Sequence, residues 1–241
     1  MSGLKRANGA KGSMIPGEII SYLDMCQAEG INLQKGMNFK LRNGNNIILM
    51  SVRDGAPYAD RFEDEGKVLI YEGHDINRTH PSINPKNFDQ PMYTQGNKLT
   101  ANGLFYNAAQ KAKQTKTPEI VRVYEKIKPS IWVYNGVFNL VDAWIETLNN
   151  RQVFKFKLEI TSEPISNIIK PNLDSDNRAI PPEIKRAVWA RDQGKCIKCG
   201  ISSNLHFDHI IPYSKGGSSL VAENIQLLCA SCNLSKHANI E

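Results

Sequence analysis

The stretch that decides the architecture of the C-terminal part is CIKCGISSNLHFDHIIPYSKGGSSLVAENIQLLCASC, residues 196–232. It begins and ends with a Cys-x-x-Cys pair, and 29 residues separate the two pairs. Four sulfurs supplied as two tight pairs match the tetrahedral coordination that Zn²⁺ prefers. Two disulfides would suit an exported protein, and a redox pair would not need a twin, so both alternatives are weaker. We predict a structural zinc site formed by Cys196, Cys199, Cys229 and Cys232.

A second set of polar residues lies within and just after this stretch. Asp208 and His209 adjoin at the end of a predicted strand, so one side chain can bind a metal while the other faces a substrate. Asn233 lies at the start of a predicted helix, from which it can supply a second oxygen ligand. Oxygen ligands of this kind suit Mg²⁺ or Mn²⁺. Taken alone, an Asp-His pair is more often structural than catalytic.

Residues 181–239 resemble an HNH endonuclease domain of the zinc-knuckle type, with its ββα-metal core. The resemblance implies that His209 is the general base and that Asp208 is a catalytic metal ligand. It implies that Asn224 holds the loop that carries the base. Asn233, where many members have His, would be the second ligand of magnesium or manganese.

The N-terminal part has the pattern of a mostly antiparallel sheet, perhaps closed into a barrel, with one or two packed helices. Helical spacing predicts helices over Ile15–Ala28 and Leu99–Lys113. Asn135-Gly136, between two β-rich runs, predicts a hairpin turn. The fold class is therefore α+β. The predicted strands are Ile47–Val52, Lys67–Tyr71, Ile120–Tyr124, Ile131–Tyr134, Val137–Ala143 and Val153–Ile160.

Short motifs in this part resemble the SRA (YDG) fold, a PUA-like β-barrel that flips a modified cytosine out of DNA. They are Gly55–Asp60, Tyr71–Asp75, Asp89–Pro91, Gly96–Asn97 and Tyr134–Gly136. The resemblance implies base binding by Tyr58 and Tyr71, which would sandwich the base, and by Asp60 at its Watson-Crick edge. Arg61 is a rival for the edge contact. The structural alternative is that both tyrosines are core residues of the sheet.

Four basic residues are candidates for DNA binding. Arg42 and Arg78 lie in stretches where the family inserts loops into DNA, Lys215 lies between His209 and Asn224, and Lys236 follows the last cysteine. A solvated surface side chain is the ordinary alternative for each lysine. The net charge of +6 is weak evidence for a DNA partner, because half of it comes from residues 1–13.

The composition predicts a flexible leader (1–13) and a proline-rich linker (161–181). The two resemblances imply an SRA-like domain over 14–160 and an HNH domain over 182–241. No apolar run reaches the roughly 18 residues that span a bilayer, so we expect a cytoplasmic protein without a membrane segment.

The two resemblances together imply an endonuclease that cuts double-stranded DNA carrying 5-methylcytosine or 5-hydroxymethylcytosine. One HNH centre cuts one strand, so we expect a homodimer, or pairing on DNA, for double-strand cleavage. One alternative is an HNH nuclease or nickase for unmodified DNA. Another is a non-catalytic reader of modified DNA with a merely structural zinc domain.

Overall fold

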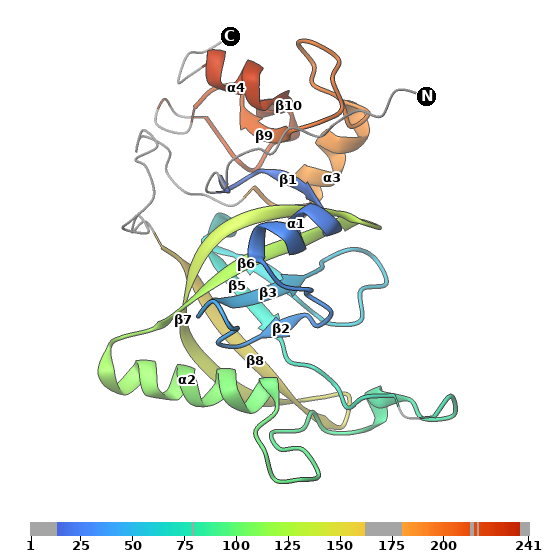
Figure 1. Cartoon of the computed structure of the whole chain (residues 1–241), viewed down its shortest axis with the longest axis vertical. Coiled ribbons are helices and arrows are strands. Elements are labelled where there is room, and N and C mark those ends of the chain that lie inside the picture. The colour runs from blue at the N-terminus through green and yellow to red at the C-terminus, as the bar shows by residue number, and fades with distance from the viewer. Residues whose placement is uncertain (1–13, 79, 162–179, 213–214, 216, 237–241) are drawn as a thin grey trace.

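The computed structural model describes residues 14–78, 80–161, 180–212, 215 and 217–236 of the 241-residue chain. The predicted leader, and residues 162–179 of the predicted linker, lie outside the described residues. Figure 1 shows a large N-terminal domain built on a curved sheet and a small C-terminal domain stacked on one end of it. Within the described ranges, no helix is both long and apolar enough to cross a bilayer.

The N-terminal domain is built on an eight-stranded mixed sheet. Hydrogen-bonded neighbours follow the order β2-β3-β6-β7-β8-β5-β4, and β1 pairs with β7. Only the printed pairing of β3 with β6 is parallel, so the expectation of a mostly antiparallel sheet is confirmed. The strands are β1 (Ile19–Ser21), β2 (Met37–Asn38), β3 (Asn46–Met50), β4 (Arg61–Glu63), β5 (Val68–Glu72), β6 (Glu119–Lys128), β7 (Ile131–Leu148) and β8 (Arg151–Ile160).

The predicted hairpin at Asn135-Gly136 is wrong, because both residues lie inside the 18-residue strand β7. The register with β6 slips here: Tyr134 pairs with Tyr124 and Gly136 with Val123, so Asn135 is an extra residue in a β-bulge. Gly136 has a φ of +96°, which explains the glycine. The tight turn that closes β7 onto β8 uses Asn149-Asn150, both with positive φ. The Asn-Gly dipeptide therefore forms a β-bulge in this strand and not a hairpin turn.

The first helix begins later than the sequence predicts. Residues 19–21 form β1 on the edge of β7, and α1 (Tyr22–Glu29) follows, with the Ser21 side chain capping its first turn. The second predicted helix is confirmed as α2 (Ala101–Thr115), and Thr100 caps it by accepting a bond from the Gly103 backbone.

The core of the domain lies between the curved sheet and α2, which covers one end of it in Figure 1. The strand predicted over Val153–Ile160 is confirmed as β8, and its alternate residues Phe154, Phe156 and Leu158 are buried and face this core. Lys155, on the opposite face, is also buried, at 1% exposure. A lysine is almost never fully buried unless it is paired, so its surroundings are informative.

The C-terminal domain has a ββα core preceded by another helix. The preceding helix is α3 (Pro182–Arg191), and a proline occupies its first position. β9 (Leu205–His209) and β10 (Ile225–Cys229) form a two-stranded antiparallel sheet, and α4 (Ala230–Lys236) follows directly.

The N-terminal segment of the chain lies between the two domains. Gly17 donates its backbone N–H to Tyr134 of β7 and accepts one from Phe207 of β9, so it hydrogen-bonds to both sheets. A side chain at Gly17 would meet the Phe207 carbonyl oxygen at 3.2 Å, and its φ is +90°. This close approach requires glycine.

A buried ion pair also joins the domains. Lys185 of α3 donates to Glu125 of β6 at 2.8 Å, and also to the side-chain oxygen of Asn135 in the bulge. Lys185 and Glu125 are 1% and 0% exposed. A single apolar cluster surrounds the contact, with Ile127 and Val133 from one domain and Val188, Phe207 and Leu227 from the other. The two domains are therefore packed against each other as parts of a continuous core.

Candidate reader pocket and nuclease site

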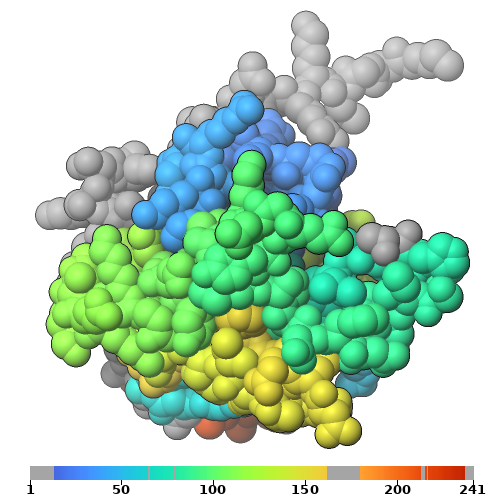
Figure 2. Space-filling view, turned by 90° about the horizontal axis from the view of Figure 1, so that it is seen from below, coloured from blue at the N-terminus to red at the C-terminus, as the bar shows by residue number. Residues whose placement is uncertain are grey.

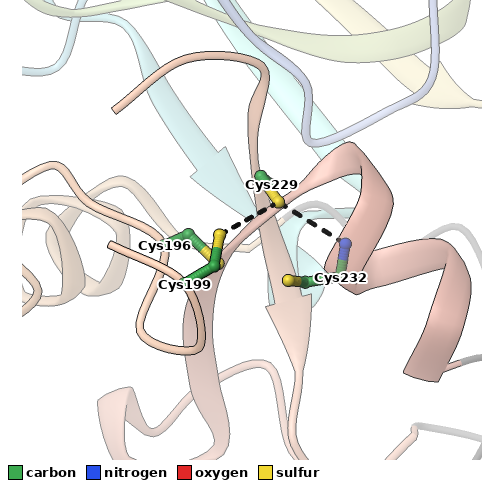
Figure 3. Close-up of side chains that lie close together, drawn as sticks. All are labelled: Cys196, Cys199, Cys229 and Cys232. Carbon is green, nitrogen blue, oxygen red and sulfur yellow. Dashed lines mark hydrogen bonds between the residues drawn. The ribbon is translucent and has the colours of Figure 1, made fainter. Parts of the chain in front are cut away.

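The four predicted zinc ligands come together in the C-terminal domain. The Sγ atoms of Cys196, Cys199, Cys229 and Cys232 all lie within 4.8 Å of one another (Figure 3). Sulfurs bound at about 2.3 Å to one tetrahedral zinc are separated by roughly 3.8 Å, so the cluster fits the ion. None of the five cysteines, all in the described part, forms a disulfide. The geometry therefore agrees with zinc binding and disfavours the disulfide alternative.

The local chain geometry explains how the sulfurs converge. The backbone N–H of Gly200 bonds to the Cys196 carbonyl, which folds the first pair into a tight turn. The second pair spans the junction of β10 and α4, where the Cys232 N–H points at the Cys229 Sγ at 3.5 Å. Cys199 Sγ lies 3.6 Å from Cys229 Sγ, so each pair reaches the other.

Asp208 and His209 lie at the end of β9, as predicted. Asp208 Oδ2 accepts hydrogen bonds from Lys236 Nζ at 2.8 Å and from Gln226 Nε2 at 2.9 Å. Lys236 also donates to the backbone carbonyl of His209 and is 1% exposed. The predicted metal ligand Asp208 is therefore paired with a buried lysine from α4.

The His209 ring is oriented by a buried serine. Its Nε2 lies 2.8 Å from Ser219 Oγ, and Ser219 is 2% exposed. Burial lowers the pKa of His209, Asp208 opposes this effect and Lys236 adds to it. The neutral imidazole that can accept a proton from water is therefore the favoured form near pH 7.

Asn224 braces the loop that follows His209. Its side-chain oxygen accepts the Ile211 N–H at 2.8 Å, and its amide group donates to the carbonyls of Ile211 and Ser218. Gly217 packs so closely that a Cβ would lie 1.7 Å from the Ile211 carbonyl oxygen. This loop-holding geometry is the one expected for Asn224, and its role in catalysis stays a prediction.

Asn233 lies within α4, one helical turn before Lys236. Residues three apart share a helix face, so Asn233 and Lys236 both lie on the side of α4 that carries the contact with Asp208. Asn233 is half-buried. Its assignment as a metal ligand agrees with this placement and remains a prediction.

In the N-terminal domain, Tyr58 and Tyr71 both contact His74, a residue to which the sequence pattern assigned no role. The His74 ring stacks on Tyr58 with centroids 5.1 Å apart and planes 12° apart. Its Nε2 lies 2.8 Å from the Tyr71 hydroxyl. Tyr71 is 1% exposed and belongs to the core, whereas Tyr58 is half-buried. Burial lowers the pKa of His74 to about 4, so its ring is neutral.

Asp60 is held by the backbone. Its two oxygens accept the N–H groups of Ser51 at 3.2 Å and Glu72 at 3.0 Å, which link three segments around the pocket. Burial raises its pKa to about 7, and the two backbone bonds oppose this shift. Arg61, the rival for the edge contact, is exposed on β4. Asp60 therefore ties the Ser51 and Glu72 backbones together, and its contact with a base remains a prediction.

A buried charge network stands behind Tyr58. Glu72 accepts hydrogen bonds from Lys155 at 2.9 Å and Arg151 at 3.4 Å, which explains the burial of Lys155. Asp75 accepts from Arg151 at 2.6 Å and donates its backbone N–H to the Tyr58 hydroxyl at 3.3 Å. Such a network is costly to break, because each partner left alone is a buried unpaired charge.

The four predicted DNA contacts differ in accessibility. Arg42, Arg78 and Lys215 are exposed, and Arg78 also donates to the Pro81 carbonyl. Lys236 is not the surface lysine that the sequence suggested, because its ammonium group is buried against Asp208. Figure 2 views the end opposite the C-terminal domain, where α2, the segment 80–98 and the β7-β8 turn form the surface.

Comparisons with known proteins agree with this division of the chain. The family model for the SAD/SRA domain matches residues 13–163, and the model for the HNH endonuclease matches residues 196–239. The chain belongs to the SAD/SRA domain family. It also carries an HNH endonuclease domain, so it is a DNA endonuclease. The predicted α+β class, with an SRA fold and a cysteine-rich HNH domain, is confirmed.

No curated protein matches the chain. Among solved structures it is similar to the SUVH5 SRA domain with fully methylated CG DNA, at 24% identity over 67% of this chain and 96% of that chain (TM-score 0.43). The same domain bound to fully hydroxymethylated CG DNA matches at 24% over 66% and 97% (0.39). The phosphorothioation-dependent restriction endonuclease ScoMcrA matches at 16% over 93% and 55% (0.43). These likenesses are too distant to carry an argument.

Sequence reasoning missed two features of the SRA and HNH sites. His74 lies within the motif Tyr71–Asp75, in which the resemblance gives a role only to the tyrosine. The sequence signal for His74 is its position three residues after Tyr71. Ser219, which bonds to His209, is one of two adjacent serines, and no sequence pattern distinguishes it from Ser218.

Proposed function

We propose that this endonuclease is modification-dependent: its SRA domain binds a flipped 5-methylcytosine or 5-hydroxymethylcytosine, and its HNH domain hydrolyses the DNA. The observation that carries the proposal is the close packing of two domains: an SRA domain in which Tyr58, His74 and Tyr71 lie together, and an HNH domain in which His209 bonds to Ser219. The domains correspond to residues 14–160 and 182–241, joined by the linker 161–181. Double-stranded DNA with a modified cytosine is the proposed partner.

The reading step uses the exposed aromatic side of the pocket. Flipping a base costs a few kcal/mol of stacking, and an aromatic side chain that stacks on it offsets roughly 1–3 kcal/mol. Tyr58 is the half-buried ring that is suited to this role, and Tyr71 forms the floor. Arg42 and Arg78, both exposed, are placed to contact the DNA around the vacated position.

The cutting step uses the groups at the end of β9. His209 takes a proton from water, the resulting hydroxide attacks the phosphorus, and the bond to the 3′ oxygen breaks, which leaves 5′-phosphate and 3′-hydroxyl ends. Asp208 and Asn233 offer hard oxygen donors that fit Mg²⁺ or Mn²⁺. When bound, this ion supplies charge stabilisation for the pentacovalent phosphate and the leaving oxygen. Asn224 keeps the loop in place, and Lys215 contacts a phosphate.

The zinc ion is proposed as a structural cofactor. The domain has a two-stranded sheet and two short helices, so it needs the four thiolates to hold β10 and α4 to the first knuckle. Thiols that must stay reduced for zinc fit a cytoplasmic location. One HNH centre cuts one strand, so a second copy is needed for a double-strand break.

The test compares two plasmids of identical sequence, one with modified cytosines and one without, in Mg²⁺ and in Mn²⁺. We expect the wild-type protein to cut the modified plasmid and to leave the unmodified one intact, and the His209→Ala variant to cut neither. Equal cutting of both plasmids would favour a nuclease for unmodified DNA. Binding of the modified plasmid without any cutting would favour a non-catalytic reader, and accumulation of open circles would identify a nickase.

A further inference from the structure

His74 occupies the position where a base stacked on Tyr58 would have to lie. The two rings are nearly parallel, at 12°, with centroids 5.1 Å apart. At the edge of the ring, the imidazole Nε2 is 2.8 Å from the Tyr71 hydroxyl. The imidazole therefore makes one stacking contact and one hydrogen bond to the two tyrosines.

The backbone of His74 is fixed, so its side chain is the part that can move. Its N–H donates to the Asn102 side chain at 2.8 Å, and its carbonyl accepts from the same amide group at 2.8 Å. Asn102 lies in the first turn of α2 and is 2% exposed. A Cβ at Gly73 would lie 2.7 Å from the Gln90 side chain, so the preceding residue is also tightly packed.

The Gly36 backbone packs closely against the imidazole edge of His74. A Cβ at Gly36 would lie 2.7 Å from His74 Nε2 and 2.9 Å from the Tyr71 hydroxyl, so the Gly36 backbone closes that side. Lys86 Nζ lies 4.2 Å from the Tyr58 ring centroid, and Lys86 is held to Asp75 by an ion pair of 3.0 Å. Tyr58 is thus held in place, and the His74 ring has to turn toward solvent if a base is to replace it.

We propose that the imidazole of His74 is a stand-in for the flipped base, which fills the pocket of the DNA-free protein and must leave Tyr58 before a base can bind. This inference rests on the proposed function, because it assigns a residue to the base pocket of the SRA domain. The ring sets a threshold for base entry. An incoming base regains the stacking on Tyr58 but must compensate for the lost contact between His74 and Tyr71, and a 5-substituent adds the apolar contact that does so.

The first test measures binding of a duplex with one 5-methylcytosine, and of the same unmodified duplex, in the non-cutting His209→Ala background. Adding His74→Ala should tighten binding of the methylated duplex about tenfold, which is the size of one aromatic contact plus one hydrogen bond. The control is His80→Ala, because His80 is exposed and bonds only locally to Ser82. Unchanged or weaker binding after His74→Ala would overturn the inference.

The second test keeps His74 in place, so it does not depend on the folding of the His74→Ala variant. Stacking on Tyr58 shifts the His74 ring protons upfield in the NMR spectrum, and adding the methylated duplex to the His209→Ala protein should move them toward solvent-exposed values. Ring protons that keep their shift in the complex would overturn the inference. If the protein binds both duplexes equally, the proposed function fails, whereas preference for the methylated duplex with an unmoved ring defeats the inference alone.

Discussion

The proposed base-binding site and the proposed nuclease site have one feature in common and differ in the structure that supports them. In each, a side chain with a proposed role contacts a neighbour from the same domain: Tyr58 stacks on His74, and Asp208 pairs with Lys236. The pocket is supported by an eight-stranded sheet with a large apolar core. The nuclease site is supported by two strands, two helices and four thiols. A large domain can position a site by packing alone, whereas a small one needs a metal and a neighbour.

Removing the zinc should give the largest difference between the two regions. Zinc binding by small domains contributes roughly 10–16 kcal/mol, so Cys229→Ser should unfold the HNH domain and abolish cleavage. The SRA domain should still bind modified DNA. Cys26→Ser is the control, because Cys26 lies on α1, away from the cluster. Cleavage by Cys229→Ser at the wild-type rate would contradict the structural role of zinc.

Removing His209, the proposed general base, should affect cutting alone. We expect His209→Ala to lower the cleavage rate by about 10²- to 10⁴-fold, because proton transfer from water loses its acceptor. Binding of modified DNA, measured by titration, should be unchanged, since His209 lies in the HNH domain. The exposed Lys215→Ala should lower cleavage much less. A His209→Ala variant that cuts normally would rule out this mechanism.

Breaking the ion pair between the two domains should make them unfold and move independently. Lys185→Met leaves Glu125 as a buried, unpaired charge, which costs about 3–5 kcal/mol. We expect denaturant unfolding to split into two steps and cut positions to spread, because the HNH domain is no longer held at one angle. Lys195→Met, a change at an exposed lysine of the same domain, is the control. A single unfolding step with sharp cut positions would show that the ion pair does not couple the domains.

The smallest effect concerns pH and the reader pocket. The pKa of His74 is lowered to about 4 in the folded protein, against about 6.5 in the unfolded chain, so the unfolded chain binds the extra proton between these values. The contribution of the neutral His74 to the free energy of unfolding is therefore fully present above pH 6.5. About 3 kcal/mol of it is lost as the pH falls to 4. The measurement is denaturant unfolding of wild type and His74→Ala across this range. Parallel pH profiles would contradict the burial of a neutral His74.

Much of this architecture could be predicted from the sequence, because the signals are local. The cysteine spacing, the alternation in β8 and the adjacent Asp208-His209 each depend on a few neighbouring residues. The Asn135-Gly136 bulge could not be predicted, since the same dipeptide suits a turn. The pairing of β7 along its whole length places the dipeptide in a strand. Tertiary pairing overrode a local preference.

The sequence also could not predict the contact of Lys236 with Asp208 or that of His74 with Tyr58. Lys236 is five positions from the chain end and 28 positions from Asp208, and the lysine alone does not reveal which acid it meets. His74 meets Tyr58 across 16 positions, through the turn between β4 and β5. Both contacts require the folded sheet, and both concern the residues that a ligand would displace.

The most direct test of the account follows the ends that the enzyme produces. Two duplexes of identical sequence, one with a single modified cytosine, are mixed and cut in the same tube, and the ends are sequenced. The account predicts cuts only in the modified duplex, at a fixed distance from the modified base, with 5′-phosphate and 3′-hydroxyl ends, because the reader and the nuclease are packed together through Lys185 and Glu125. Equal cutting of both duplexes, or cuts unrelated to the position of the modified base, would contradict it.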